Sequence, residues 1–186
     1  GRCRSCKTKI SKQYPVIEIL TGLIFLSIFN LQFPIFNKII LALVFSIYIA
    51  ITIYDLRHKI IPDSLVYPAI FLSILNRWFS GGATLDWWAG PILFLFFSLI
   101  WFLTKGRAMG FGDAKLALSM GFLLGIAAGI SAIVLAFWIG ALAGIFWLIV
   151  NRNITMKSEI PFAPFLILGG WLSLIFDLDL LHVSLF

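Results

Sequence analysis

Gly110-Phe111-Gly112-Asp113 sets one carboxylate behind two glycines, between a polar run and a long apolar segment. Glycine permits backbone conformations and close approaches that a side chain would block, so we expect this stretch to bend and expose Asp113 at a membrane boundary. A second acid, Asp55, follows Tyr54 at the end of an earlier apolar segment. Two acids at the edge of the hydrocarbon predict an aspartyl protease.

The composition excludes a soluble globular core. Hydrophobic residues make up 61% of the 186 residues and charged residues only 12%, which is typical of a polytopic membrane protein. Apolar runs long enough to cross a bilayer as helices, or nearly so, number about seven. The predicted fold class is therefore an all-α transmembrane helix bundle, with spans at 16–30, 37–54, 64–79, 86–103, 114–124, 126–150 and 161–178.

The net charge of +6 is carried by short loops between the apolar runs. This distribution favours anionic lipid headgroups over nucleic acid as the neighbour of the basic residues. Short loops rich in lysine and arginine stay in the cytoplasm. If the N-terminal head is inside, only Lys38 and Arg77 fall outside, whereas Asp55 and Asp113 share the cytoplasmic face. The C-terminus then lies outside.

The chain divides into a basic cytoplasmic head, residues 1–15, and a membrane-embedded domain, residues 16–186. The head carries the only two cysteines, Cys3 and Cys6. A Cys-x-x-Cys pair is half of a structural zinc site, which normally takes four ligands. Two cytoplasmic thiols without a metal are the alternative interpretation.

The remaining acids and the late prolines have mainly structural interpretations. Asp113 itself could cap the fifth helix, and Asp55 could be a solvated loop acid paired with a neighbouring base. Asp63 indicates a turn and helix start, and Asp86 is expected to cap the fourth helix. Lys115 is expected to extend toward lipid headgroups. The segment 161–164, Pro-Phe-Ala-Pro, favours a helix start over a substrate-docking element.

The order of these motifs resembles that of the bacterial type IV prepilin peptidases, a family of GxGD intramembrane aspartyl proteases. The resemblance covers nearly the whole chain and rests on Cys3-x-x-Cys6, Tyr14-Pro15-Val16-Ile17-Glu18, Tyr54-Asp55, Pro62-Asp63, Gly110-x-Gly112-Asp113 with Lys115, and Pro161-Phe162-Ala163-Pro164-Phe165. It implies an endopeptidase of the bacterial inner membrane that removes the basic leader of type IV prepilins, or of the pseudopilins of type II secretion. Cleavage would follow a glycine at the cytoplasmic membrane face. Asp55 and Asp113 match the catalytic pair of this family.

The resemblance also implies which cofactors to expect. Proteolysis by two acids needs none. Many family members methylate the new N-terminal residue, usually phenylalanine, with S-adenosylmethionine, and Cys3 and Cys6 then match part of a structural zinc region. Relative to the family, we expect the chain to lack the usual first helix and first cysteine pair, and therefore to methylate poorly.

Two other classes of protein fit parts of the pattern. A protease similar to presenilin or signal peptide peptidase shares the Tyr-Asp and Gly-x-Gly-Asp motifs and would use the same chemistry. A proton-coupled transporter would use membrane acids as relays and would place them near the middle of its spans. Cleavage of a leader with glycine before the cut separates the prepilin peptidase from both.

Overall fold

A computed structural model describes residues 1, 6–8, 11, 13–81, 83–107, 109–150 and 161–180. Within these residues the chain is all-helical and has no strand, which confirms the predicted fold class. The seven helices are α1 (Gln13–Asn30), α2 (Ile35–His58), α3 (Asp63–Ser80), α4 (Thr84–Thr104), α5 (Phe111–Leu124), α6 (Ile126–Val150) and α7 (Ala163–Phe176).

Each predicted span overlaps one of these helices, and the break between the fifth and sixth spans lies at Gly125 as predicted. Gly125 has a φ of +83°, a conformation that residues with a side chain rarely adopt. Its amide still bonds the carbonyl of Gly121, so α5 is capped before the chain turns into α6. The short connection therefore depends on a glycine at this point.

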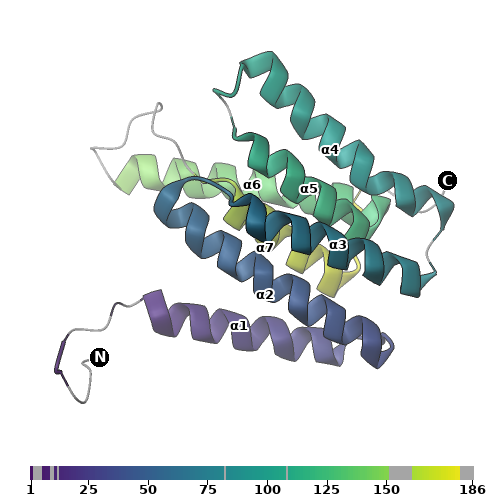
Figure 1. The fold of residues 1–186 in the computed structure, drawn as a ribbon. Helices are drawn as coiled ribbons and strands as arrows, with labels where there is room; N and C mark the ends of the chain where they lie inside the picture. Colours follow the sequence, from purple (N-terminus) through teal and green to yellow (C-terminus); the bar gives the residue numbers. More distant parts are fainter. Residues whose placement is uncertain are drawn as a thin grey trace.

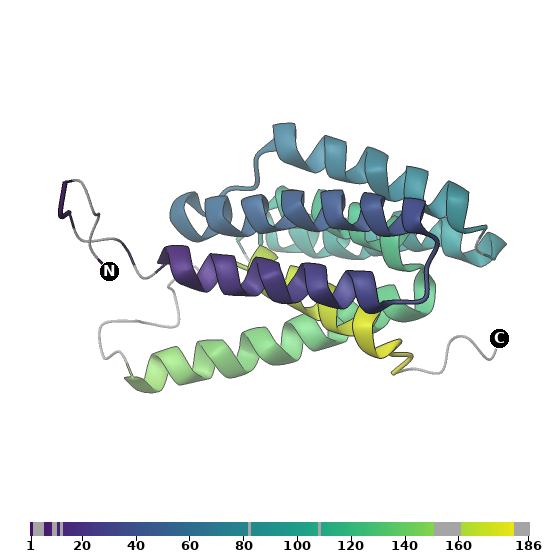
Figure 2. The ribbon, with the colours of Figure 1, turned by 90° about the horizontal axis from the view of Figure 1, so that it is seen from below.

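Successive helices run in alternate directions through the bundle (Figure 1). The C-terminal end of α2 and the N-terminal ends of α5 and α7 consequently lie at one end of the molecule, as a second view confirms (Figure 2). We call this the acid end, because Asp55 and Asp113 belong to α2 and α5. The alternation places the two acids at the same depth, as the sequence predicted.

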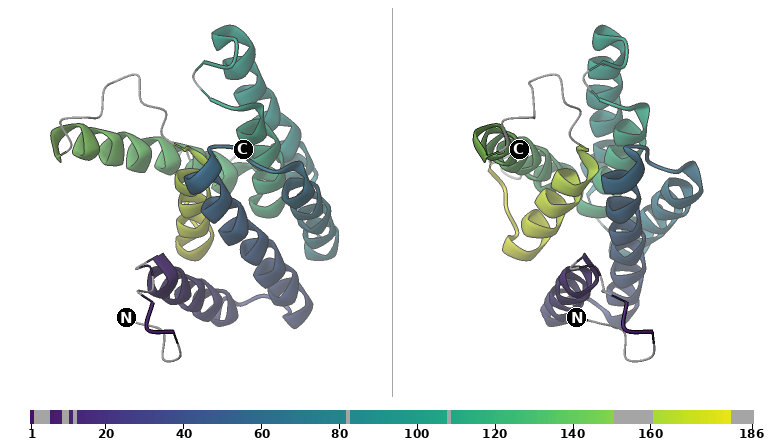
Figure 3. Two further views of the ribbon diagram at one scale, coloured as in Figure 1. Left: turned by 60° about the vertical axis from the view of Figure 1, so that its left-hand side comes forward. Right: turned by 90° about the vertical axis from the view of Figure 1, so that its left-hand side faces the viewer.

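Three helices are long and apolar enough to cross a membrane, namely α2, α4 and α6, and α1 and α7 are shorter apolar helices. The second half of α6 projects away from the other helices (Figure 3). Its large apolar side chains are exposed, including Leu142, Ile145 and Ile149. A surface of this kind suits a lipid environment, because a helix that is hydrophobic all round is buried in protein or in a bilayer.

The bundle core contains a chain of hydroxyl groups among its apolar side chains. Tyr48 of α2 bonds Ser119 of α5 through their oxygens at 2.9 Å, and Ser73 of α3 lies 3.0 Å from the same Ser119 oxygen. All three side chains are fully buried. Polar side chains away from water must find partners within the protein, so this network ties α2, α3 and α5 together.

The opposite end of the bundle is held by Arg77 of α3 and Asp86 of α4. Arg77 donates to the carbonyls of Phe122 and Leu123 at the end of α5, and it pairs with Asp86 at 3.3 Å. The other oxygen of Asp86 accepts the amide of Ile126 at 3.0 Å. The prediction that Asp86 caps its own helix is therefore wrong. Its carboxylate reaches the first amide of α6, which has no partner within that helix.

Candidate active site

Asp55 lies in the last turn of α2. The helix continues to His58 and closes with Lys59 in the left-handed conformation, its amide bonding the carbonyl of Asp55 at 2.8 Å. The Asp55 side chain is buried, so its interpretation as a solvated loop acid is wrong. The backbone amide of Ala163 donates a hydrogen bond to this carboxyl. The oxygen Oδ2 has no hydrogen-bond partner in the described part of the chain.

Asp113 is the third residue of α5, because the helix begins at Phe111 with Gly110 as its N-cap. Its Oδ2 accepts the amide of Gly110 at 3.2 Å, and its own amide donates to the Gly110 carbonyl at 3.2 Å. Asp113 is therefore not the N-cap residue, although its side chain helps to satisfy the helix start. The side chain is buried rather than exposed, which corrects the sequence expectation. Its Oδ1 has no partner among the described residues.

Gly112 is required for a close approach between α5 and the chain that precedes α3. A Cβ atom at Gly112 would lie 2.8 Å from Cβ of Ile61, closer than real Cβ atoms come to other atoms. Gly110 is different, because its φ of −75° is open to any residue and its nearest neighbour would be 3.7 Å away. Gly112 is therefore needed for close packing against Ile61. Neither a bend nor a close contact requires a glycine at position 110.

Asp55 and Asp113 interact electrostatically across the space between α2 and α5. Asp55 accepts a hydrogen bond from the Ala163 amide, and Asp113 accepts one from the Gly110 amide. Each carboxylate also has one oxygen without a partner among the described residues. Buried groups of this kind are uncommon and costly, because a desolvated polar atom normally finds a partner. The arrangement can hold a polar molecule or group between the two acids.

The sequence signals around the pair have mixed outcomes. Lys115 does not extend to headgroups: its ammonium pairs with Asp63 at 2.6 Å and lies over the rings of Tyr67 and Phe111. α3 starts at Asp63 as predicted, but its N-cap residue is Pro62 and makes no side-chain cap bond. Asp63 therefore links α3 to α5 instead of capping its own helix.

The cysteine pair is only partly described. Cys3 lies outside the described residues, while Cys6 is exposed and its sulfur accepts a hydrogen bond from the Thr8 hydroxyl at 3.1 Å. In the ranges that the structure describes, no group of three or more His, Cys, Asp or Glu side chains could hold a metal ion. The described part of the chain therefore does not by itself form the four-ligand site that structural zinc needs.

Two contributions to the site were not predicted from the sequence. The Ala163 amide carries no side-chain signal, although the prolines around it mark the start of α7. In the hydroxyl network, Tyr48 and Ser119 lie about two turns from the acids on α2 and α5, and Ser73 joins them from α3. Hydroxyl groups inside otherwise apolar spans are the signal that could have found it.

These features define a helical bundle of membrane type with two buried, interacting carboxylates at one end. The sequence matches the profile of the type IV leader peptidase family over residues 40–145, and that of a bacterial peptidase A24 N-terminal domain over residues 1–32. The chain belongs to the type IV leader peptidase family, as its motifs suggested. No solved structure matches the chain.

Curated relatives carry the name prepilin leader peptidase/N-methyltransferase. The Aeromonas hydrophila protein is 33% identical over 183 residues, which is 94% of this chain and 62% of the relative. The Pseudomonas aeruginosa protein is 31% identical with the same coverage, and the Neisseria gonorrhoeae protein is 32% identical over 92% of this chain and 60% of the relative. The chain thus spans about three fifths of the length of these relatives.

Proposed function

We propose that this chain is an intramembrane aspartic endopeptidase whose catalytic pair is Asp55 and Asp113. Its proposed substrates are type IV prepilins or pseudopilins, cut after a glycine at the end of a basic leader. One observation carries the proposal: two interacting carboxylates from separate helices are buried at one end of an apolar bundle, each with an unpartnered oxygen. Ionisable groups held at such a cost are functional candidates.

Peptide hydrolysis by two carboxylates needs one ionised acid and one protonated acid. The ionised acid takes a proton from water, and the protonated acid polarises the carbonyl of the scissile bond. Repulsion between two close carboxylates favours this singly charged state over a doubly charged one. We assign the two reacting groups to Oδ2 of Asp55 and Oδ1 of Asp113, the oxygens without partners. The amides of Ala163 and Gly110 orient the two side chains.

The acids lie in terminal turns of α2 and α5, where water and an extended substrate segment can reach them more easily than at midspan. This placement supports a peptidase over a proton-coupled transporter, which would use acids near the centre of the membrane. The substrate's own apolar segment can partition into lipid beside the bundle, while its basic leader stays in water.

Replacement of either acid by asparagine tests the proposal directly. Asp55→Asn and Asp113→Asn should each lower the rate of leader cleavage by about 100-fold or more, with normal membrane insertion. Asp63→Asn is the matched control, since Asp63 pairs with Lys115 at the same end of the bundle and is exposed. The assay is co-expression with a panel of prepilins, followed by sequencing of the mature N-terminus. The assignment would be overturned if Asp55→Asn kept full activity while a folded Asp63→Asn protein lost it.

We further propose a multi-pass location in the bacterial inner membrane, with the head and the acid end in the cytoplasm. Cysteine labelling tests this in a variant that lacks the native cysteines. Labels at His58, the last residue of α2, and at Gly106, between α4 and α5, should react from the cytoplasm, and labels at Ile35 and Gly81 only from outside. Inverted labelling would remove the proposed orientation.

Methylation of the new N-terminus by S-adenosylmethionine is a separate proposal, motivated by the names of the relatives. Cys3 and Cys6 would contribute two thiolates to a zinc site in the head, and zinc there would supply folding free energy rather than chemistry. Cleavage should then be unchanged in the Cys3→Ser, Cys6→Ser protein. Mass spectrometry of the mature pilin, with the methyl donor present, reads out both activities, and loss of cleavage in that variant would contradict the separation.

A further inference from the structure

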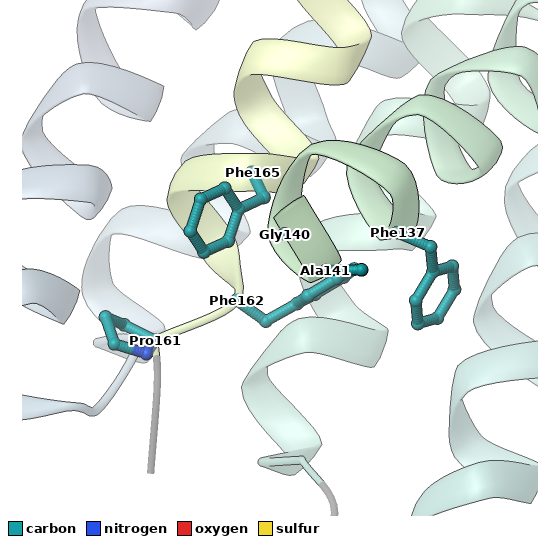
Figure 4. A pocket seen from close by; sticks show the side chains of 6 residues that line it. All are labelled: Phe137, Gly140, Ala141, Pro161, Phe162 and Phe165. Atoms are coloured by element: carbon teal, nitrogen blue, oxygen red, sulfur yellow. The ribbon is translucent and has the colours of Figure 1, made fainter. Parts of the chain in front are cut away.

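The start of α7 supplies a backbone group, rather than a side chain, to the acid pair. The helix begins at Ala163, whose amide donates to the Asp55 carboxyl. Figure 4 shows this part of the chain, around a small pocket between α6 and α7, where Pro161 and Phe162 lead into α7. An amide cannot change its position by rotating a side chain. The bond to Asp55 therefore depends on where the backbone of α7 lies.

Contacts with α6 set the position of α7. The Ser173 hydroxyl donates to the Ala128 carbonyl of α6 at 2.7 Å. Nearer the start of α7, Phe165 lies next to Gly140 of α6 (Figure 4), and a Cβ atom on that glycine would meet the phenyl ring at 3.4 Å. α7 thus follows α6 from Ser173 to Phe165, which is most of its length.

Gly169 lies between these contacts, where the backbones of α6 and α7 approach closely. A Cβ atom at this position would overlap the carbonyl oxygen of Ala132 and lie 3.0 Å from the amide nitrogen of Ala136. Both atoms belong to the backbone of α6, so a change of rotamer cannot make room. A side chain at position 169 would have to push α7 away from α6 by about 1 Å to reach an ordinary contact distance.

The neighbouring Gly170 faces a different kind of atom. A Cβ atom there would meet the end of the Met120 side chain of α5, with its Cε at 2.7 Å. Methionine is unbranched and flexible, so the end of its side chain can move without a shift of either helix. Both glycines are buried in α7. The same change to alanine therefore meets fixed backbone at Gly169 and a movable side chain at Gly170.

A shift of α7 at Gly169 would reach the acids. Ala163 lies six residues before Gly169 in the same helix, or about 9 Å at a rise of about 1.5 Å per residue. The donor and acceptor atoms of an amide hydrogen bond lie about 2.7–3.2 Å apart, so a displacement of about 1 Å breaks the bond. A misplacement of this size at a catalytic group can slow a reaction by about 100-fold.

We propose that Gly169 is a positioning residue for Asp55. It lets α7 lie against the α6 backbone, which puts the Ala163 amide on the Asp55 carboxyl and leaves Oδ2 of that carboxyl free for the reaction. Gly169 acts through the amide and is not itself a catalytic residue. The inference rests on the proposed peptidase function, and it adds α6, a helix that contributes no acid, to the elements on which that function depends.

The first test measures the kinetics of leader cleavage by the full chain in phospholipid vesicles, with a prepilin that the wild-type protein processes. Gly169→Ala should lower kcat by about tenfold or more and keep KM within about twofold, because it disturbs the orientation of an acid rather than substrate binding. Gly170→Ala is the matched control and should keep both constants within about twofold.

The pH–rate profile separates positioning from a general loss of packing. A hydrogen bond from an amide favours the ionised carboxylate, so its loss should move one limb of the profile to higher pH by about one unit. The acidic limb moves if Asp55 is the ionised acid of the pair with Asp113, and the alkaline limb moves if it is the protonated one. Lactic acid in place of Ala163 replaces the amide by an ester, removes the N–H alone and should give the same shift.

The outcomes separate the positioning role from the activity. A wild-type pH profile in Gly169→Ala would overturn the inference even if the rate falls, since it would assign the glycine to packing alone. An unchanged profile in the ester protein would also overturn it, and this measurement decides if Gly169→Ala does not fold. Either result leaves the peptidase proposal standing. A wild-type protein that cleaves no prepilin would remove the proposed function, and this inference with it.

Discussion

Replacement of Arg77 by methionine should lower the free energy of unfolding by about 3 kcal/mol. The guanidinium makes three hydrogen bonds, to the Phe122 carbonyl at 3.0 Å, to Asp86 at 3.3 Å and to the Leu123 carbonyl at 3.4 Å. A bond from a charged group contributes about 1.5–3 kcal/mol. At the lower end of this range, with each of the two longer bonds counted at about half, the three bonds together contribute about 3 kcal/mol. The Arg77 side chain is only 9% exposed, so little water can replace these partners.

Asp86→Asn should cost less, about 1 kcal/mol, because Asp86 is more exposed and asparagine keeps an acceptor for the Ile126 amide. The assay is thermal unfolding in detergent micelles followed by circular dichroism. For a chain of this size 1 kcal/mol corresponds to about 2–4 °C, so Arg77→Met should lower Tm by about 6–12 °C.

A double-mutant cycle tests the reasoning behind the magnitude. If Arg77 and Asp86 act as one unit, the double variant should lose less stability than the sum of the single losses, by more than about 0.5 kcal/mol. Additive losses would show that the ion pair contributes nothing of its own. A Tm for Arg77→Met within 2 °C of wild type, about 1 kcal/mol at most, would refute the claim that this end of the bundle depends on the arginine.

Gly112→Ala should slow leader cleavage and lower stability by about 1–3 kcal/mol through its clash with Ile61. Gly110→Ala, at a glycine with no close neighbour, is the matched control and should change both much less; full activity in Gly112→Ala would contradict the close-approach argument. Tyr48→Phe should cost about 1 kcal/mol in chemical denaturation, because it removes the bond to Ser119 but leaves the two serines paired with each other; unchanged stability in Tyr48→Phe would show that the hydroxyl is irrelevant. Lys115→Met should change stability by about 1 kcal/mol or less, since its partner carboxylate is exposed; a drop in Tm larger than about 6 °C would place this ion pair among the main supports of the fold.

The helices were predictable because each apolar run is bounded by charged residues, prolines or glycines. The alternation of the runs was enough to place Asp55 and Asp113 at one end of the bundle. Details that depend on where a helix begins were less predictable. Asp113 looks like an N-cap in the sequence, but the helix starts earlier, at Phe111, so that the acid lies in its first turn.

Contacts between helices account for the remaining differences. Asp86 bonds the start of α6, and Lys115 pairs with Asp63, because α4 and α3 pack beside α5. Neither partner lies near its counterpart in the sequence, so neither contact leaves a local pattern. The sequence suggested that Gly112 allows the chain to bend. In the structure, a glycine is needed there because Ile61, on another segment, leaves no room for a side chain.

The amide of Ala163 places an unusual constraint on evolution at this position. A hydrogen bond from the backbone survives any change of side chain that fits, and the buried alanine admits only small residues. Proline is the one substitution of modest size that deletes the donor outright. Prolines stand at positions 161 and 164, on both sides of this residue. They stiffen the approach to α7 while leaving in place the Ala163 N–H that bonds the Asp55 carboxyl.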